Sequence, residues 1–186
     1  MTQNTNTLNG LNVDNFQATV AAITEQPVVA KFQFRAENEW LSAGHNRTTV
    51  TDFDGACETH EHEKPHVMDN DEPAVLLSTD KAANPGVFAL HALAGCICSA
   101  LVYHATARGI TIHSVESKLY GDVDLRGFLG MDEKVRNGFT DVRVVVKVNA
   151  DASPEVLDEL VELARDRSPL CDIIANPTPL TVERAA

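Results

Sequence analysis

The sequence predicts an α+β domain in which helices pack on one face of a mainly antiparallel sheet, and three observations support this fold class. Asn84 to Gly109 is an almost uncharged apolar segment, as expected of a long buried helix. Residues 140–150, TDVRVVVKVNA, have the clearest strand pattern in the chain. The expected helices and strands do not alternate strictly, as they would in a doubly wound fold. The 186 residues, 44% hydrophobic and 23% charged, suit one compact domain with a full core.

An amphipathic helix is expected over residues 13–24, because apolar residues recur there at steps of three and four, and Pro27 ends it. Three runs that alternate or are rich in β-branched residues then predict strands at 28–34, 48–53 and 74–78. The first two runs are expected to form an antiparallel pair joined by residues 36–47. Residues 54–72 are polar, contain Gly and Pro and show no period, so they are expected to form a long surface loop.

The second half of the chain begins with the long apolar helix. Asn84-Pro85 is a helix-start signal, Gly109 a natural stop, and Arg108 in the last turn favours the helix dipole. Ser153-Pro154 and Ser168-Pro169 are two further start signals, each with Ser as the N-cap. The other elements expected here are a strand at 110–120, a Gly-rich insert at 121–138, a short helix at 170–175 and a closing strand at 179–183.

Charge and composition exclude several classes of partner. The net charge of −12 and pI near 4.9 disfavour nucleic-acid phosphates and anionic membrane surfaces, which favours a small neutral or apolar substrate. His91, Tyr103, His104 and many small residues argue against a membrane span at 84–109. The first ten residues show no secretory signal, so a cytoplasmic location is expected, in which cysteines stay reduced.

Two cysteines stand out as candidate reactive groups. Cys96 lies in the middle of the apolar helix, and Cys98 faces about 200° away from it around the axis, so the two cannot easily bridge each other. Cys171 is the third helical residue after Ser168, where unpaired amides can stabilise a thiolate. The plainer interpretation is that Cys96 and Cys98 are small core residues. Catalytic or redox use is favoured over a structural disulfide framework.

A metal site is a separate hypothesis. Cys57, His60, His62 and His66 have a spacing that could wrap zinc or another borderline metal within the expected loop. The alternative is a charged, solvated loop, because Glu and Lys residues are interleaved among these side chains.

Three segments resemble the family of osmotically inducible protein C and organic hydroperoxide resistance protein (OsmC/Ohr). These are NPGVFALHALAGCICSALVYHATARGI, VESKLYGDVDLRGFLGMDEKVRNGF and RSPLCDIIANPTPLTV, and the second is especially similar to a bacterial OsmC-like subgroup. The resemblance covers most of the chain from about Val28. It implies an OsmC-like domain over residues 28–186, preceded by a helical extension over 1–27. It also implies an intertwined homodimer with sites at the subunit interface.

The resemblance implies a peroxidase site as well. Cys96 occupies the position of the cysteine that attacks the peroxide, and an arginine from the first strands would activate it. Arg35 and Arg47 are both candidates, and Arg47 is preferred. The family's resolving cysteine is replaced by Ser168, which leaves Cys171 as the possible resolver, and its glutamate is missing at Gly86 and Val87.

The leading hypothesis is therefore a thiol-dependent peroxidase that reduces organic hydroperoxides in oxidative stress defence. It would need an external thiol reductant but no cofactor. One alternative is a non-peroxidatic OsmC-like protein that binds a small apolar ligand in the dimer cleft. The other is metal binding through residues 57–66.

Overall fold

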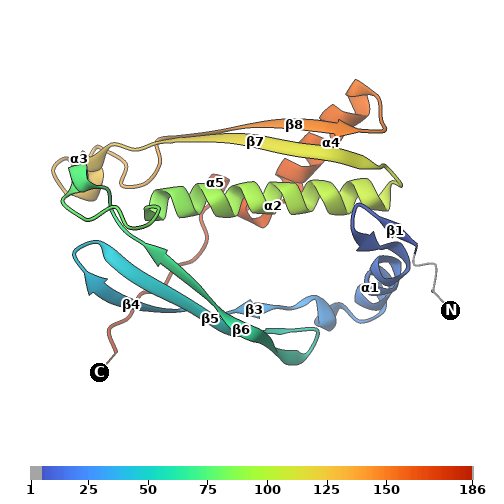
Figure 1. Ribbon diagram of the computed structural model, residues 1–186, viewed down its shortest axis with the longest axis horizontal. Helices are drawn as coiled ribbons and strands as arrows, with labels where there is room; N and C mark the ends of the chain where they lie inside the picture. Colours follow the sequence, from blue (N-terminus) through green and yellow to red (C-terminus); the bar gives the residue numbers. More distant parts are fainter. Residues whose placement is uncertain (1–5, 186) are drawn as a thin grey trace. The chain divides into compact units, whose positions relative to one another are not determined.

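The computed structural model describes residues 6–185, and its fold is α+β with antiparallel strand pairs, as the sequence predicts (Figure 1). Contacts divide the chain into two compact units, Met1–Ala89 and Leu90–Ala186. The boundary falls within helix α2 (Pro85–Ala107), which begins in the first unit and continues in the second.

The first unit opens with a short hairpin and a helix. Strands β1 (Thr7–Leu8) and β2 (Leu11–Asn12) precede helix α1 (Val13–Glu25), and the Asn12 side chain caps α1 by accepting a hydrogen bond from the Asn15 amide at 2.8 Å. This confirms the helix predicted at 13–24. The strand predicted at 28–34 is wrong for its first half, where Pro27 starts a 3₁₀ turn, η1 (Pro27–Ala30).

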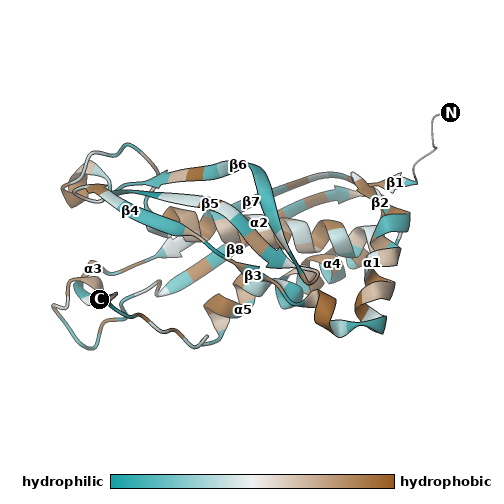
Figure 2. Cartoon of the chain, turned by 90° about the horizontal axis from the view of Figure 1, so that it is seen from below, coloured by the Kyte–Doolittle hydropathy of each residue, from teal (hydrophilic) through white to brown (hydrophobic). Residues whose placement is uncertain are grey.

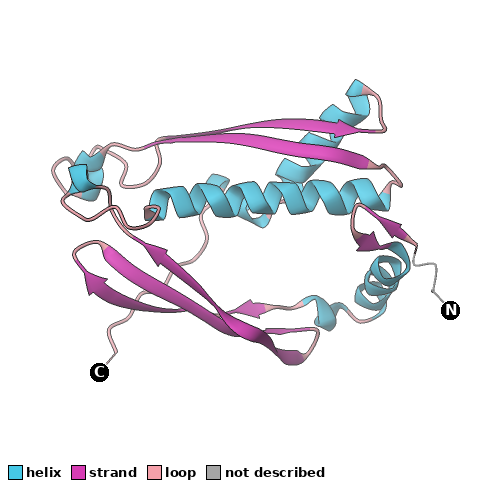
Figure 3. Cartoon of the chain, viewed as in Figure 1, coloured by secondary structure: helices cyan, strands magenta, loops and turns pink. Residues whose placement is uncertain are grey.

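The four-stranded sheet of the first unit is built around β5 (His45–Gly55). Strands β3 (Gln33–Phe34) and β4 (Glu37–Ser42) pair with successive parts of β5, and β6 (Glu58–Asn70) also pairs with it, all antiparallel (Figure 3). The connection predicted at 36–47 and the loop predicted at 54–72 are therefore wrong. Strand β6 is mostly exposed and carries a bulge opposite Val50 to Asp52, so its sequence lacks the alternation that burying one face would impose.

The turn between β5 and β6 explains why the hairpin is hard to recognise. Gly55 pairs with Glu58, and the two residues between them, Ala56 and Cys57, both have positive φ, +50° and +66°. Such turns normally use Asn-Gly or Asp-Gly, because other residues are strained in this conformation.

Cys57→Gly is expected to raise the free energy of unfolding by about 1 kcal/mol, because glycine adopts positive φ without the clash of a Cβ. Urea unfolding of the two proteins measures the difference. Cys57→Ala is the matched control, since it removes the same thiol without relieving the backbone, and it should give no gain. An equal gain from both variants would contradict the explanation.

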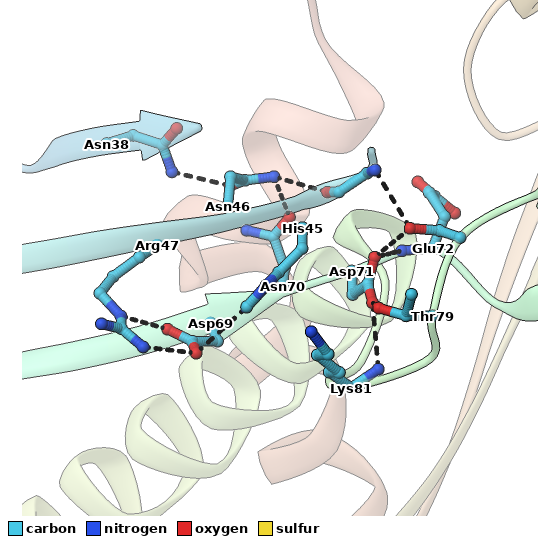
Figure 4. Close-up of polar contacts among 12 residues, drawn as sticks. Asn38, His45, Asn46, Arg47, Asp69, Asn70, Asp71, Glu72, Thr79 and Lys81 are labelled. Carbon is cyan, nitrogen blue, oxygen red and sulfur yellow. Dashed lines mark hydrogen bonds and ion pairs between the residues drawn. The ribbon is translucent and has the colours of Figure 1, made fainter. Parts of the chain in front are cut away.

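The segment that follows β6 is organised by Asp71, whose side chain is fully buried (Figure 4). Asp71 accepts hydrogen bonds from the hydroxyls of Ser78 and Thr79 and from the amides of Glu72 and Lys81. These donors, chiefly the two hydroxyls, hold the pKa of Asp71 well below its usual value. The strand predicted at 74–78 is wrong: a 3₁₀ turn, η2 (Ala74–Leu76), lies inside this loop.

The second unit packs the rest of α2 against a hairpin of β7 (Ile112–Asp122) and β8 (Asp141–Ala150), which confirms both predicted strands. Helix α2 is apolar along most of its length (Figure 2). Four of its five buried residues recur at steps of four, namely Leu93, Ile97, Leu101 and Ala105, and the fifth is Thr106. Alternate β8 residues, Val142, Val144, Val146 and Val148, pack against this core.

The remaining helices of the second unit are α3 (Leu125–Phe128), α4 (Pro154–Arg167) and α5 (Pro169–Ala175). Ser153 and Ser168 cap α4 and α5, which confirms both predicted start signals. The closing strand predicted at 179–183 is wrong, because residues 177–185 form no regular secondary structure. Helix α2 is long and apolar enough to cross a membrane by length and composition alone, a test that the core helix of a soluble domain also passes.

Candidate functional site

The three cysteines of the second unit lie on two helices, α2 and α5. Cys96, on α2, is half-buried, whereas Cys98 is exposed, as their separation around the helix predicts. The interpretation of Cys98 as a core residue is therefore wrong. All four cysteines are free thiols, and Cys57 is exposed at the turn between β5 and β6. Of the two α2 cysteines, Cys96 is the one in a partly enclosed setting.

Cys171 lines an apolar cavity of about 410 Å³ in the second unit. Leu93 and Ile97 of α2 are among its other lining residues, and Ile97 directly follows Cys96 in the chain. The Ser168 hydroxyl accepts a hydrogen bond from the Cys171 amide at 3.2 Å, as the start signal predicts. Arg165 also lines the cavity, and its guanidinium interacts electrostatically with Cys171.

Arg35, one of the two predicted activators, is occupied by two carboxylates in the first unit. Its Nε donates to Asp52 at 2.7 Å, and its Nη1 donates to Asp54 at 2.6 Å. Nη2 also contacts both carboxylates. These contacts raise the pKa of Arg35, mainly through Asp54, and lower the pKa of Asp54 to about 2. With two carboxylates and one guanidinium, the cluster carries a net charge of −1.

Arg47, the other predicted activator, is held by a single carboxylate (Figure 4). Arg47 on β5 and Asp69 on β6 face each other directly in the strand register. The Nε and Nη2 groups of Arg47 donate to the two oxygens of Asp69, at 2.7 and 2.9 Å. His45 Nε2 lies 3.2 Å from one of these oxygens. The pKa of Asp69 falls to about 2, chiefly because of the hydrogen bonds from Arg47.

The two arginines therefore differ in what they can still bind. All three nitrogens of Arg35 contact a carboxylate, whereas Nη1 of Arg47 has no acceptor within residues 6–185. A guanidinium with a free N–H group and one carboxylate partner can attract another anion better than one already shared by two carboxylates. Arg47 therefore keeps one nitrogen for a further anion, and its role as the activator stays a prediction.

The predicted metal ligands lie on or beside β6. The rings of His62 and His66 form a T-shaped pair with centroids 4.4 Å apart, and Phe53 stacks on His60 at 5.0 Å. His60 Nε2 also lies 3.0 Å from the Gly55 carbonyl. Among the described residues, no three His, Cys, Asp or Glu side chains come together as metal ligands. The geometry gives the metal-binding alternative no support, since these rings pack against aromatic neighbours and each other.

The sequence interpretation did not identify two residues of the Arg47 cluster, Asp69 and His45. His45 and Arg47 share one face of β5, because they are two residues apart. That spacing is visible in the sequence as His-Asn-Arg. The sequence does not identify Asp69 as their partner, because it predicts a loop over residues 54–72 and a loop has no strand register.

Comparisons with known proteins address the fold and the family. Residues 78–183 match the family model described as OsmC-like protein. One similar solved structure is an OsmC-like protein from Mycoplasma pneumoniae, with 14% identity and a TM-score of 0.59, covering 78% of this chain and 89% of that one. An OsmC-like protein of unknown function from Vibrio cholerae has 14% identity and a TM-score of 0.56, covering 76% and 92%.

A third similar structure is an organic hydroperoxide resistance protein from Legionella pneumophila. It shares 17% identity at a TM-score of 0.50, covering 76% of this chain and 89% of that one. No curated protein matches the chain by sequence. At these identities the structural likeness establishes the fold, which agrees with the α+β architecture predicted from the sequence.

Proposed function

Because the chain belongs to the OsmC-like protein family, we propose that it is a thiol-dependent peroxidase that reduces organic hydroperoxides, with Cys96 as the nucleophile. The observation that carries the proposal is the free, half-buried Cys96 thiol on α2, within the residues that match the family model. The name of the Legionella pneumophila structure, an organic hydroperoxide resistance protein, supports the same substrate class.

In the proposed reaction the Cys96 thiolate attacks one oxygen of the O–O bond. An S–O bond forms as the O–O bond breaks, the sulfur is oxidised to a sulfenic acid, and the substrate leaves as an alkoxide that takes a proton to become an alcohol. The Cys171 thiol is the proposed resolver: it attacks the sulfenic sulfur, a disulfide forms and water leaves. An external thiol reductant then regenerates both cysteines by thiol–disulfide exchange.

The activating cation in this proposal is Arg47, because Arg35 is already shared by Asp52 and Asp54. A nearby cation favours the thiolate form of a cysteine, which is the reactive form. As the family resemblance implies, the working unit would be a homodimer. Large apolar side chains exposed on the single chain, such as Phe34, Trp40 and Phe128, are consistent with a further covering surface.

The apolar cavity beside Cys171 favours a second candidate function, the binding of a small apolar ligand without peroxide chemistry. Its lining is mainly Val, Leu and Ile from α2, β8, α4 and α5. In the peroxidase proposal the same cavity would hold the organic part of the hydroperoxide. A pocket of this size and composition is typical of small-molecule sites.

The test is to mix the reduced protein with cumene hydroperoxide and follow each cysteine by mass spectrometry. We expect Cys96 to be lost far faster than free cysteine, with a Cys96–Cys171 disulfide as the product. Cys96→Ser should abolish the fast reaction. Oxidation no faster than that of free cysteine would refute the peroxidase proposal, and saturable binding of an apolar ligand that survives Cys96→Ser would then support the second candidate.

A further inference from the structure

The cavity beside Cys171 in the second unit combines apolar walls with a charged rim. It lies where α2, β8, α4 and α5 meet (Figure 1), and its volume is about 410 Å³. Leu93 and Ile97, which α2 contributes to the lining, are only 2% and 5% exposed. Two charged side chains also line the cavity, Glu162 and Arg165, and both belong to exposed residues of α4. A ligand would therefore place its apolar part among aliphatic side chains and its polar end beside these two groups.

The cation of this rim is already neutralised. The Nε and Nη2 groups of Arg165 both contact the same oxygen of Asp166, each at 2.8 Å. These contacts are the main cause of the raised pKa of Arg165, and the negative charge of Glu162 contributes in the same direction. With two carboxylates and one guanidinium, the rim carries a formal charge of −1.

This arrangement of charge distinguishes between two kinds of apolar ligand. A carboxylate would lose hydration at the cavity, and Arg165, the cation in the lining, already has Asp166 as its partner. Like charges brought together at a binding site also cost free energy. The whole chain carries a net charge of −12, so its field adds to the repulsion of an anion. An uncharged molecule of the same shape meets none of these penalties.

We propose that the cavity beside Cys171 selects uncharged apolar molecules and rejects those that end in a carboxylate, with Glu162 and Asp166 setting this selectivity. The inference deepens the proposed function and rests on it for the nature of the substrate, because the same cavity would hold the organic part of the hydroperoxide. It assigns to the protein neutral alkyl or aryl hydroperoxides in preference to hydroperoxides that carry a carboxylate.

Cys171 can report on the cavity because it is part of the lining. A bound molecule should cover its thiol and slow its alkylation by iodoacetamide, whereas Cys98 is exposed and does not line the cavity. The two probes are 1-decanol and decanoate, which have the same carbon chain and differ in charge at neutral pH. Each probe is kept below the concentration at which it forms micelles, and mass spectrometry follows both cysteines. Isothermal titration calorimetry gives the two dissociation constants independently.

Two variants change the charge of the rim and keep the shape of each side chain. Glu162→Gln and Asp166→Asn each replace a carboxylate by an amide, so the formal charge of the rim rises from −1 to zero. Glu159→Gln is the matched control, because Glu159 also lies on α4 but pairs with Arg108 at 3.5 Å and does not line the cavity. Urea unfolding verifies that each variant is folded.

In the parent protein we expect 1-decanol to protect Cys171, and decanoate to need at least about a tenfold higher concentration for the same protection. Glu162→Gln and Asp166→Asn should each strengthen decanoate binding by about threefold and leave 1-decanol binding unchanged. Glu159→Gln should match the parent. Equal binding of the two probes, binding of neither, or a difference that neither rim variant reduces would overturn the inference.

Failure of the proposed function is a separate result, because it is measured as the loss of Cys96 with cumene hydroperoxide. These binding experiments contain no peroxide and do not depend on Cys96. A protein that binds 1-decanol in preference to decanoate but does not react with the hydroperoxide would refute the peroxidase proposal and leave the selectivity of the cavity in place.

Discussion

Arg47→Gln is expected to slow the hydroperoxide-dependent oxidation of Cys96 by about 100-fold, the size of effect seen when a preorganised donor to a developing anion is removed. Glutamine can still donate a hydrogen bond, but it carries no charge and lacks the fork that Asp69 holds at 2.7 and 2.9 Å. Both the thiolate population of Cys96 and the stabilisation of the leaving alkoxide would fall. Stopped-flow mixing with cumene hydroperoxide measures the rate.

Arg35→Gln is the matched control for this prediction, because Arg35 lies in the same four-stranded sheet and is also bound to carboxylates. It should leave the oxidation rate near that of the parent, since all three of its nitrogens already contact Asp52 or Asp54. If Arg35→Gln slows the reaction and Arg47→Gln does not, the assignment of the activating arginine is reversed.

The elements that the sequence predicts well are those whose burial imposes a period. Strand β8 alternates between exposed and half-buried positions along its full length, and the sequence shows this alternation directly. Helix α2 is apolar along most of its length and bounded by Asn84-Pro85 and Gly109, and the structure ends the helix within two residues of these signals.

The elements that the sequence prediction missed lack such a pattern. Strand β6 buries little of its surface, contains Pro65 beside its bulge, and is joined to β5 by Ala56 and Cys57 instead of a typical turn pair. The strand predicted at 179–183 is an error of the opposite kind, because a strand is expected there and none forms. Its β-favouring residues are present, but no partner strand pairs with them among residues 6–185.

The candidate site also contains some residues that the sequence predicts and others that it misses. Cys96 and Cys171 carry local signals, namely the apolar helix and the Ser168 cap, and the structure has these residues on α2 and at the start of α5. Arg47 was one of two choices. Asp69 depends on the pairing of β5 with β6, which is a long-range property of the fold, so the contact that separates Arg47 from Arg35 becomes visible only when the register is known.

Asp71→Ala is expected to lower the melting temperature by more than about 5 °C, because it removes a fully buried carboxylate and leaves four donors without their acceptor. These donors are the hydroxyls of Ser78 and Thr79 and the amides of Glu72 and Lys81. Together these four hydrogen bonds to Asp71 hold the segment between β6 and α2. Removing the carboxylate should therefore also reduce the protection of the Glu72 and Lys81 amides against hydrogen exchange.

Asp158→Ala, on the exposed face of α4, is the control and should change the free energy of unfolding by less than about 0.5 kcal/mol. Equal melting temperatures for the two variants would show that this segment does not depend on Asp71, and the fully buried carboxylate would need another explanation.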